Sequence, residues 1–287
     1  MRIERRAGPG SLETYVLSGD GAEVRLVPAR GGLVTHWSVD GEALLFLDEA
    51  TLVDVSRNVR GGIPLLFPNA GPLPVEGVEF SGRRISQPQH GLARLAAWEV
   101  IDAVGDDDTA RVSMRLRSSD ATRVGFPFDF ESELAVSLSD GRLVLEWRFT
   151  NTGDVPMPLH AGTHPYFTVP VAQKAKASVP SKATRLKERR TGDVRAATPV
   201  RFGEGEVDVA LLDHGPAATL LRGDGSRIEL NSTPQLSTLV LWTLPDQPFI
   251  CVEPWTAPGG ALASGEGVLS LPPGASEALA MELRFSR

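Results

Sequence analysis

Two short stretches of the sequence carry side chains suited to moving protons, His164 and Glu253. His164 stands in "THPYF" (163–167), directly before a proline and two aromatic residues. The proline biases the histidine towards extended backbone and removes a ladder donor, which is typical of a strand end or a bulge. Glu253 stands in "PFICVEPW" (248–255), inside an apolar run. A carboxylate there either points to solvent or is buried beside the tryptophan, which would raise its pKa and suit a general base.

The histidines could instead hold a metal. His160 and His164 are four residues apart, so they would share one face of a strand. A catalytic metal site needs a third protein ligand, for which Asp154 is the nearby carboxylate, and the His-x-His then Glu pattern of cupins is absent. We therefore expect no metal and no cofactor. Cys251, two positions before Glu253, is expected to be a small core residue rather than a nucleophile.

Two glycine-containing stretches carry further polar side chains. "RNVRGGIPLLFPNAGPL" (57–73) indicates a rigid loop in which Arg60 can bind a hydroxyl or an anion, whereas on a plain surface loop Arg60 would only be solvated. His90 lies in "QPQHGLAR" (87–94), which also has loop character. The sequence has no nucleophile elbow, Walker loop or dinucleotide fingerprint.

The elements that must position these residues are short strands. Apolar runs rich in Val, Leu and Phe alternate with polar residues, as in "RLVLEWRFTN" (142–151), and "DG" and "NTGD" turns separate them. Long helical periodicity is nearly absent. This pattern predicts an all-β fold, a large antiparallel β-sandwich, formed by one domain over residues 1–287. The most polar stretch, 171–206, is interpreted as an insertion between strands rather than a linker.

Composition narrows the function classes. The 287 residues carry a net charge of −7, which gives no reason to expect nucleic acid or an anionic membrane as a partner. With one cysteine no intrachain disulfide can form. The N-terminus is charged without an apolar signal-peptide core, and no apolar run approaches about 18 residues, the length of a membrane span. We expect a cytoplasmic enzyme, a monomer or weak dimer.

Four stretches, taken in order, resemble the landmarks of the aldose 1-epimerase (mutarotase) superfamily. They are "RGGIPLLFPNAGPL", "QHGLAR", "GTHPYF" and "CVEPWTAPGGAL". The first two are most similar to the hexose-6-phosphate mutarotase branch, and the resemblance covers essentially the whole chain. "PARGG" (28–32) departs from the small-residue turn usual there, and "THPYF" is as similar to the general aldose branch. The resemblance implies a galactose mutarotase-type sandwich that binds a sugar on the concave face of one sheet.

The resemblance also implies roles for individual residues. Glu253 matches the general base and His164 the general acid, which at its ordinary pKa would have a proton available near neutral pH. Arg60 and His90 match substrate-binding positions, and Arg94 matches a phosphate ligand of the hexose-phosphate branch. A sugar-binding aspartate is expected in "EVDVALLDH" (206–214), where Asp208 fits better than Asp213.

Anomer exchange requires only a proton taken from the C1 hydroxyl and one given to the ring oxygen, which a carboxylate and an imidazole can supply. The expected partner is a sugar or sugar phosphate. One rival is a non-catalytic carbohydrate-binding sandwich, which would not need the His/Glu pair. A glycosidase would need two carboxylates about 5–10 Å apart, and only one stands in a clear motif. A lyase and a metal-dependent cupin-type isomerase are further rivals. Sugar identity and phosphorylation stay open.

Overall fold

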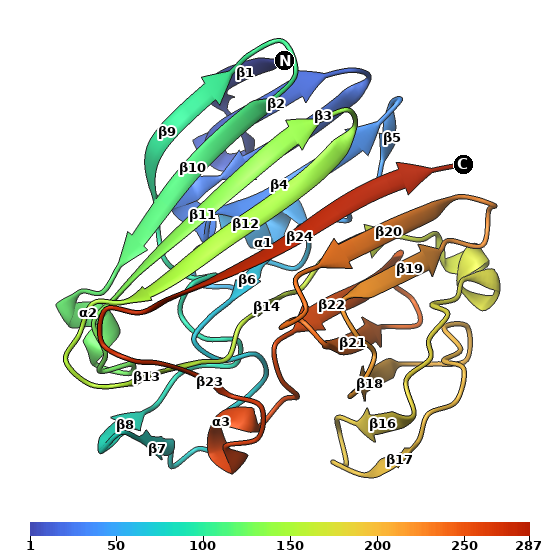
Figure 1. Ribbon diagram of the computed structural model, residues 1–287. Coiled ribbons are helices and arrows are strands. Elements are labelled where there is room, and N and C mark those ends of the chain that lie inside the picture. Colours follow the sequence, from blue (N-terminus) through green and yellow to red (C-terminus); the bar gives the residue numbers. More distant parts are fainter.

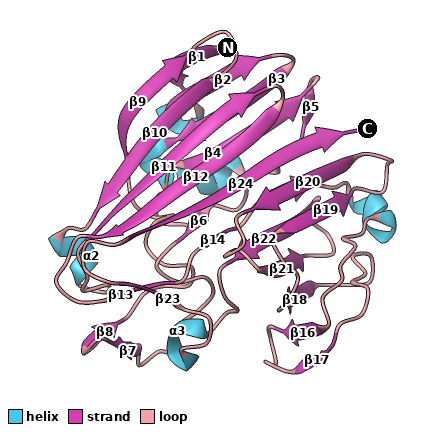
Figure 2. Ribbon diagram, viewed as in Figure 1, coloured by secondary structure: helices cyan, strands magenta, loops and turns pink.

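The computed structural model describes residues 1–287 and is dominated by antiparallel strands (Figure 1, Figure 2). The predicted all-β antiparallel sandwich is confirmed. A five-stranded sheet forms first along the chain, in the order β1-β2-β3-β4-β5. Its strands are β1 (Arg2–Ala7), β2 (Glu13–Gly19), β3 (Ala22–Val27), β4 (Leu33–Val39) and β5 (Glu42–Ala43).

A seven-stranded sheet has the order β19-β20-β24-β12-β11-β10-β9 and contains the longest strands. They are β9 (Glu99–Gly105), β10 (Ala110–Arg117), β11 (Phe130–Ser139), β12 (Arg142–Asn151), β19 (Ala217–Leu221), β20 (Arg227–Ser232) and β24 (Ser276–Ser286). The alternation predicted for 142–151 is confirmed, because Leu143, Leu145 and Trp147 are buried while Glu146 and Arg148 are exposed. Strands β10 and β11 contact β2, so this sheet packs on the five-stranded one.

An eight-stranded sheet carries the candidate site, in the order β17-β16-β18-β21-β22-β14-β6, with β15 also pairing with β22. Its strands are β6 (Leu65–Leu66), β14 (Gly162–Thr163), β15 (Tyr166–Thr168), β16 (Arg185–Glu188), β17 (Val194–Ala196), β18 (Val207–Leu211), β21 (Thr238–Thr243) and β22 (Phe249–Trp255). Thr163 Oγ1 donates to Met281 Sδ at 3.5 Å, which ties this sheet to β24. The polar stretch 171–206 supplies two of these strands, β16 and β17.

The remaining elements are short. Two two-stranded sheets are formed by the hairpin of β7 (Val78–Phe80) and β8 (Arg83–Ile85), and by β13 (Met157–Leu159) with the distant β23 (Leu269–Leu271). The helices are α1 (Glu49–Val53), α2 (Asp120–Arg123) and α3 (Ala261–Ser264), with 3-10 turns at Pro9–Ser11, Pro28–Arg30 and Val171–Lys176. A bilayer could not be crossed by any of these helices, given their length and polarity.

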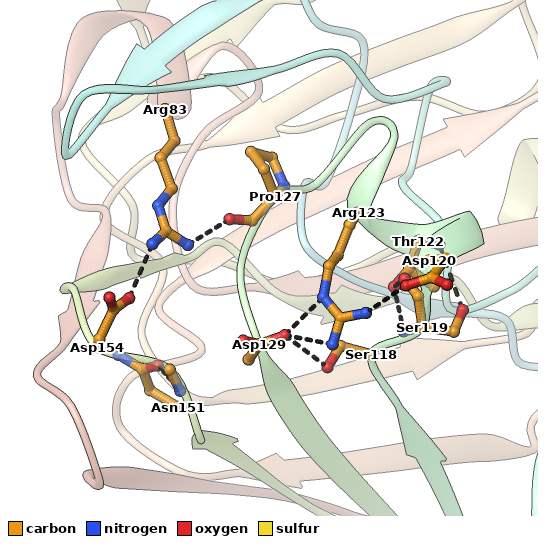
Figure 3. Close-up of polar contacts among 11 residues, drawn as sticks. Arg83, Ser118, Ser119, Asp120, Thr122, Arg123, Pro127, Asp129, Asn151 and Asp154 are labelled. Atoms are coloured by element: carbon orange, nitrogen blue, oxygen red, sulfur yellow. Dashed lines mark hydrogen bonds and ion pairs between the residues drawn. The ribbon is translucent and has the colours of Figure 1, made fainter.

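Polar contacts fasten the loops at one end of the sandwich (Figure 3). Arg83 of β8 donates to the Pro127 carbonyl at 2.6 Å and pairs with Asp154 at 2.8 Å. Beside it, Arg123 of α2 bonds Asp129 at 2.7 Å. A reciprocal Ser119–Thr122 capping box satisfies the first backbone donors of α2. These contacts fix the loops between the long strands and lie apart from the candidate site.

Candidate active site

Strand β22 carries Glu253, and both faces of this strand are covered. All seven of its residues are buried. Side chains of a strand alternate between faces, and Ile250 and Val252 enter the main core. The opposite face therefore carries Phe249, Cys251, Glu253 and Trp255.

Neighbouring strands extend this face sideways. In the ladder register, Asp208 of β18 is the partner of Trp242 of β21, and Trp242 is the partner of Cys251 of β22. Cys251 in turn pairs with Tyr166 of β15. One row of side chains thus crosses four strands on the face that carries Glu253.

His164 occupies the two-residue gap between β14 and β15, as its His-Pro sequence predicts. Its ring stacks on Tyr166, with centroids 4.7 Å apart and an interplanar angle of 12°. Its Nε2 atom lies 3.4 Å from Oε1 of Glu253. His164 is 7% exposed and Glu253 is 0% exposed. The two sequence-predicted proton-transfer groups are therefore brought into contact in a site shielded from water.

The environment of this pair moves both pKa values. Burial, with smaller effects from the positive charges of Arg189 and Arg94, lowers the pKa of His164 to about 3. Burial raises the pKa of Glu253 well above its ordinary value, and the nearby Arg189 only partly opposes this. Neither oxygen of Glu253 accepts a hydrogen bond within the protein. The ordinary His164 pKa expected from the sequence is wrong, because a buried imidazolium loses its hydration. Both shifts favour the neutral forms, an imidazole beside a protonated carboxyl group.

A cavity of about 210 Å³ opens above the pair. Its lining contains five of the six predicted site residues: Arg60, His90, Arg94, His164 and Asp208. Asn58, Val59, Gln89, Tyr166, Arg189 and Trp242 complete it. Glu253 is not part of the wall and lies directly behind His164. Three guanidinium groups face one carboxylate, so the cavity favours an anion although the chain has a net charge of −7.

His90 is held in one orientation by its surroundings. Its Nδ1 atom accepts a hydrogen bond from the Gly71 backbone N–H at 3.0 Å, so in the neutral ring Nε2 bears the hydrogen. The ring lies edge-on to His164, with centroids 5.4 Å apart. Burial, with help from His164 and Arg94, lowers the pKa of His90 well below its ordinary value. His90 is therefore a fixed neutral donor at the cavity wall.

The arginines approach the cavity from different segments. Arg60 lies over Trp242, with 5.9 Å from its Cζ atom to the ring centroid. Arg94 donates to the Gln89 carbonyl at 2.9 Å, and its Nε atom has no hydrogen-bond partner in the protein.

Sequence reasoning missed Arg189. It follows β16, lies 4.9 Å from the Trp255 ring centroid and pairs with Asp208 at 2.6 Å. The alternation in "RLKER" (185–189), with Leu186 buried, could have placed Arg189 on the same face as Lys187.

Asp213, His160 and Cys251 were considered as site residues from the sequence, and none of them lines the cavity. Asp213 accepts from the Thr184 backbone N–H at 2.9 Å on an exposed loop, so Asp208 is the aspartate at the cavity. His160 bonds backbone groups of Ala70 and Ala257 through its two ring nitrogens, which leaves neither free to share a metal with His164.

Cys251 is buried beside the proton-transfer pair rather than in the cavity wall. His164, Cys251 and Glu253 each place one potential metal-ligand atom within 4.8 Å of the others. Burial raises the pKa of the Cys251 thiol well above its ordinary value, so the thiol stays protonated and is a poor ligand.

Comparison with known proteins shows the family. A family model described as aldose 1-epimerase matches residues 13–284, and the chain belongs to this family. It is similar to the crystal structure of the Slr1438 protein from Synechocystis sp. PCC 6803, with 37% identity, a TM-score of 0.90 and 95% of each chain covered. A galactose mutarotase-like protein from Clostridium acetobutylicum shares the fold at 18% identity and a TM-score of 0.87, over 100% of this chain and 99% of that one.

Curated relatives match a shorter region. A protein of Cenchrus ciliaris named "Putative glucose-6-phosphate 1-epimerase" is 32% identical over 170 residues, 56% of this chain and 48% of that protein. A protein of the same name from Escherichia coli K12 is 26% identical over 164 residues, 55% of this chain and 48% of that protein. The chain spans about half the length of the curated relatives it matches.

Proposed function

We propose that this protein is an aldose 1-epimerase that interconverts the α and β anomers of a hexose 6-phosphate. The observation that carries the proposal is the buried contact of 3.4 Å between His164 and Glu253, directly behind the wall of an arginine-rich cavity. A carboxyl group and an imidazole in contact are sufficient for the two proton transfers of anomer exchange.

The reaction uses each group in both protonation states. In the free protein Glu253 lies behind the cavity wall, so substrate binding must bring the C1 hydroxyl into contact with Glu253 and move the shared proton from Glu253 to His164. Glu253 then takes the proton of the C1 hydroxyl, the bond between C1 and the ring oxygen breaks, and His164 gives its proton to that oxygen. The resulting aldehyde rotates about the C1–C2 bond and presents its other face. On ring closure His164 takes the proton back and Glu253 returns one to O1, so the protein ends unchanged.

Burial of the pair supports catalysis over sugar binding alone. A binding protein needs hydrogen-bond partners at the cavity wall, and it gains nothing from a fully buried carboxyl group without a partner. Such a group costs stability, and its retention beside an imidazole fits a role in proton transfer.

Three arginines support a phosphorylated substrate. Arg60, Arg94 and Arg189 line the cavity, and Asp208 neutralises only one of them by pairing with Arg189. Guanidinium groups bind phosphate oxygens in a bidentate geometry. Both curated relatives described above are named "Putative glucose-6-phosphate 1-epimerase", which agrees with this assignment.

The test is an anomerisation assay that starts from one pure anomer, with the uncatalysed rate subtracted. We expect a larger kcat/KM for glucose 6-phosphate than for glucose or galactose. Equal or better use of the neutral sugars would contradict the phosphate assignment. Tight binding of sugars without any acceleration of anomer exchange would instead support a carbohydrate-binding protein.

A further inference from the structure

A buried arginine outside the cavity, Arg30, lies behind the loop that carries Arg60. It belongs to the "PARGG" turn and is only 7% exposed. Its Nε donates to the Leu52 carbonyl at 2.9 Å, and its Nη2 lies within 3.1 Å of the carbonyl oxygens of Thr51, Asp54 and Arg57. One guanidinium thus joins four carbonyls of α1 and of the loop that follows it.

Arg30 forms no ion pair, unlike most arginines of this chain. A buried cation without a counter-ion is costly unless several acceptors satisfy it. Here the acceptors are backbone carbonyls of residues 51–57. The loop must therefore keep one conformation to satisfy the charge, and conversely the charge holds the loop in that conformation.

A second set of hydrogen bonds connects this loop to the backbone of Arg60. Thr51 Oγ1 accepts from the Arg60 backbone N–H at 2.9 Å and donates to the Asp48 carbonyl at 2.7 Å. The Asp48 backbone N–H donates to the Arg60 carbonyl at 2.8 Å. Thr51 is 1% exposed, so these bonds are shielded from water. Arg30 holds Thr51, and Thr51 and Asp48 hold both backbone polar groups of Arg60.

The same turn contacts the segment that carries Arg94. The Gly31 backbone N–H donates to the Ala96 carbonyl at 2.9 Å. A Cβ atom at Gly31 would lie 2.5 Å from the Arg94 carbonyl oxygen, so only glycine allows this approach, and its φ of 81° also favours glycine. Arg30, Gly31 and Arg94 line one small cavity with Asn58 and Val59, which also line the site.

We propose that Arg30 is a positioning residue that sets the spacing of Arg60 and Arg94 for the phosphate of the substrate. This inference rests on the proposed preference for a hexose 6-phosphate. The turn of residues 28–31 contacts both arginine-bearing segments through the bonds described. A bidentate anion site loses affinity when its guanidinium groups shift, whereas the proton-transfer pair on β22 and beside β14 is held by other strands.

Four variants test the inference. In Arg30→Met the guanidinium is lost but the side chain stays long, and in Thr51→Val the hydroxyl is lost but the shape stays. We expect each to raise KM for glucose 6-phosphate about tenfold, the scale of a coupling of ~1.4 kcal/mol, with kcat and the KM for glucose nearly unchanged. Thr51→Ser keeps the oxygen and should restore the wild-type KM. Arg30→Lys keeps the charge but loses the planar set of guanidinium N–H donors. It should restore the wild-type KM for glucose 6-phosphate only in part.

Arg25→Met serves as the matched control, because Arg25 lies on the neighbouring strand β3 and pairs with Glu23 at 2.6 Å. Its KM values should equal those of the wild type. A wild-type KM for glucose 6-phosphate in folded Arg30→Met or Thr51→Val would overturn the inference. An equal loss for glucose and glucose 6-phosphate would also overturn it, since a general structural role would act on both sugars. If Arg30→Met does not fold, the comparison of Thr51→Val with Thr51→Ser tests the inference.

Calorimetric titration with inorganic phosphate separates this inference from the function on which it rests. Phosphate binding by the wild type that weakens in Arg30→Met supports both. Binding of equal strength in both proteins overturns the role of Arg30 alone. A wild type that binds no phosphate and does not prefer glucose 6-phosphate overturns the substrate assignment, and the role of Arg30 falls with it.

Discussion

His164 and Glu253 lie 3.4 Å apart in a site where the carboxyl group is fully buried and accepts no hydrogen bond. Burial favours the neutral form of both groups, which lowers one pKa and raises the other. Both shifts therefore favour a neutral imidazole beside a protonated carboxyl group. Anomer exchange needs one group that gives a proton and one that takes a proton, and a pair with a single proton supplies both.

Replacing either member of this pair should stop catalysis. We expect Glu253→Gln and His164→Asn each to lower the anomerisation rate by at least about 10²-fold, the usual contribution of an acid–base group. The measurement is kcat/KM for glucose 6-phosphate from polarimetry or a coupled assay. A near-normal rate in a correctly folded variant would remove that residue from the mechanism.

Thermal unfolding supplies the folding control for Glu253→Gln. The carboxyl group of Glu253 ionises more readily in the unfolded state than in the folded state, so at neutral pH it costs stability. Because its folded pKa is raised, this cost grows as pH rises above the ordinary value of 4.5. Glutamine removes the ionisation, and we expect its Tm at neutral pH to match or exceed that of the wild type. A large fall in Tm would show that the carboxyl group stabilises the fold.

The pH dependence should lack the inflection of an ordinary histidine. His164 becomes protonated only near its lowered pKa of about 3. Glu253 becomes ionised only well above its ordinary pKa. The kcat/KM for a neutral hexose should therefore show no inflection from His164 near about pH 6.5, where an unperturbed histidine titrates. A neutral sugar is needed because a sugar phosphate itself titrates near about pH 6.

Several other ionisable groups face this pair. None of them is expected to add an inflection of an ordinary histidine to the pH profile. They come from β15, the residue after β16, β18, β22 and the two arginine-bearing loops: Tyr166, Arg189, Asp208, Cys251, Arg60, His90 and Arg94. His90 is the one that normally titrates near neutrality, and burial lowers its pKa well below that range. A clear inflection near about pH 6.5 would show that His164 or His90 is hydrated and ordinary.

Local patterns were sufficient to predict much of this site. Proline after His164 predicts a strand end, and the structure places the residue between β14 and β15. Glu253 interrupts an apolar run, which left it either exposed or buried beside the tryptophan, and the structure shows it buried because β22 is covered on both faces. Alternation in β12 predicts its two faces. Each of these features depends on neighbours within a few residues.

Features that depend on pairing between distant strands could not be predicted. Asp208 meets Arg189 only because β16 and β18 pair in one register, and the polarity of 171–206 suggested a surface insertion. The lowered pKa of His164 depends on packing against Tyr166 and on three distant arginines. In the sequence, Arg30 is only a departure from the usual small-residue turn. Its four carbonyl partners belong to a segment more than 20 residues further along the chain.

Activity should not depend on a metal. His164, Cys251 and Glu253 lie close enough to bind one, but a buried, protonated thiol and carboxyl group disfavour a cation. Anomer exchange by proton transfer needs no Lewis acid. Dialysis against a strong chelator should leave kcat/KM unchanged. Loss of activity that zinc or manganese restores would count decisively against the acid–base mechanism.

Phosphate selectivity should depend on Arg94. Its side chain lines the cavity and is paired with no carboxylate, so its guanidinium charge is available to an anion there. Loss of a charge-assisted hydrogen bond costs ~1.5–3 kcal/mol, so Arg94→Ala should raise KM for glucose 6-phosphate about tenfold or more. The rate with glucose or galactose should change little. Arg57→Ala is the control, because Arg57 is exposed and does not line the cavity.

Comparison of the two substrates decides what Arg94 does. If Arg94 only holds the Gln89 loop through its bond to the Gln89 carbonyl at 2.9 Å, the variant should lose activity with both sugars. If it binds phosphate, Arg94→Lys should recover part of the affinity through its charge, while the bidentate geometry stays lost. An unchanged KM for glucose 6-phosphate in Arg94→Ala would leave phosphate binding to Arg60 and Arg189, and the same assay on Arg60→Ala would then test that arrangement.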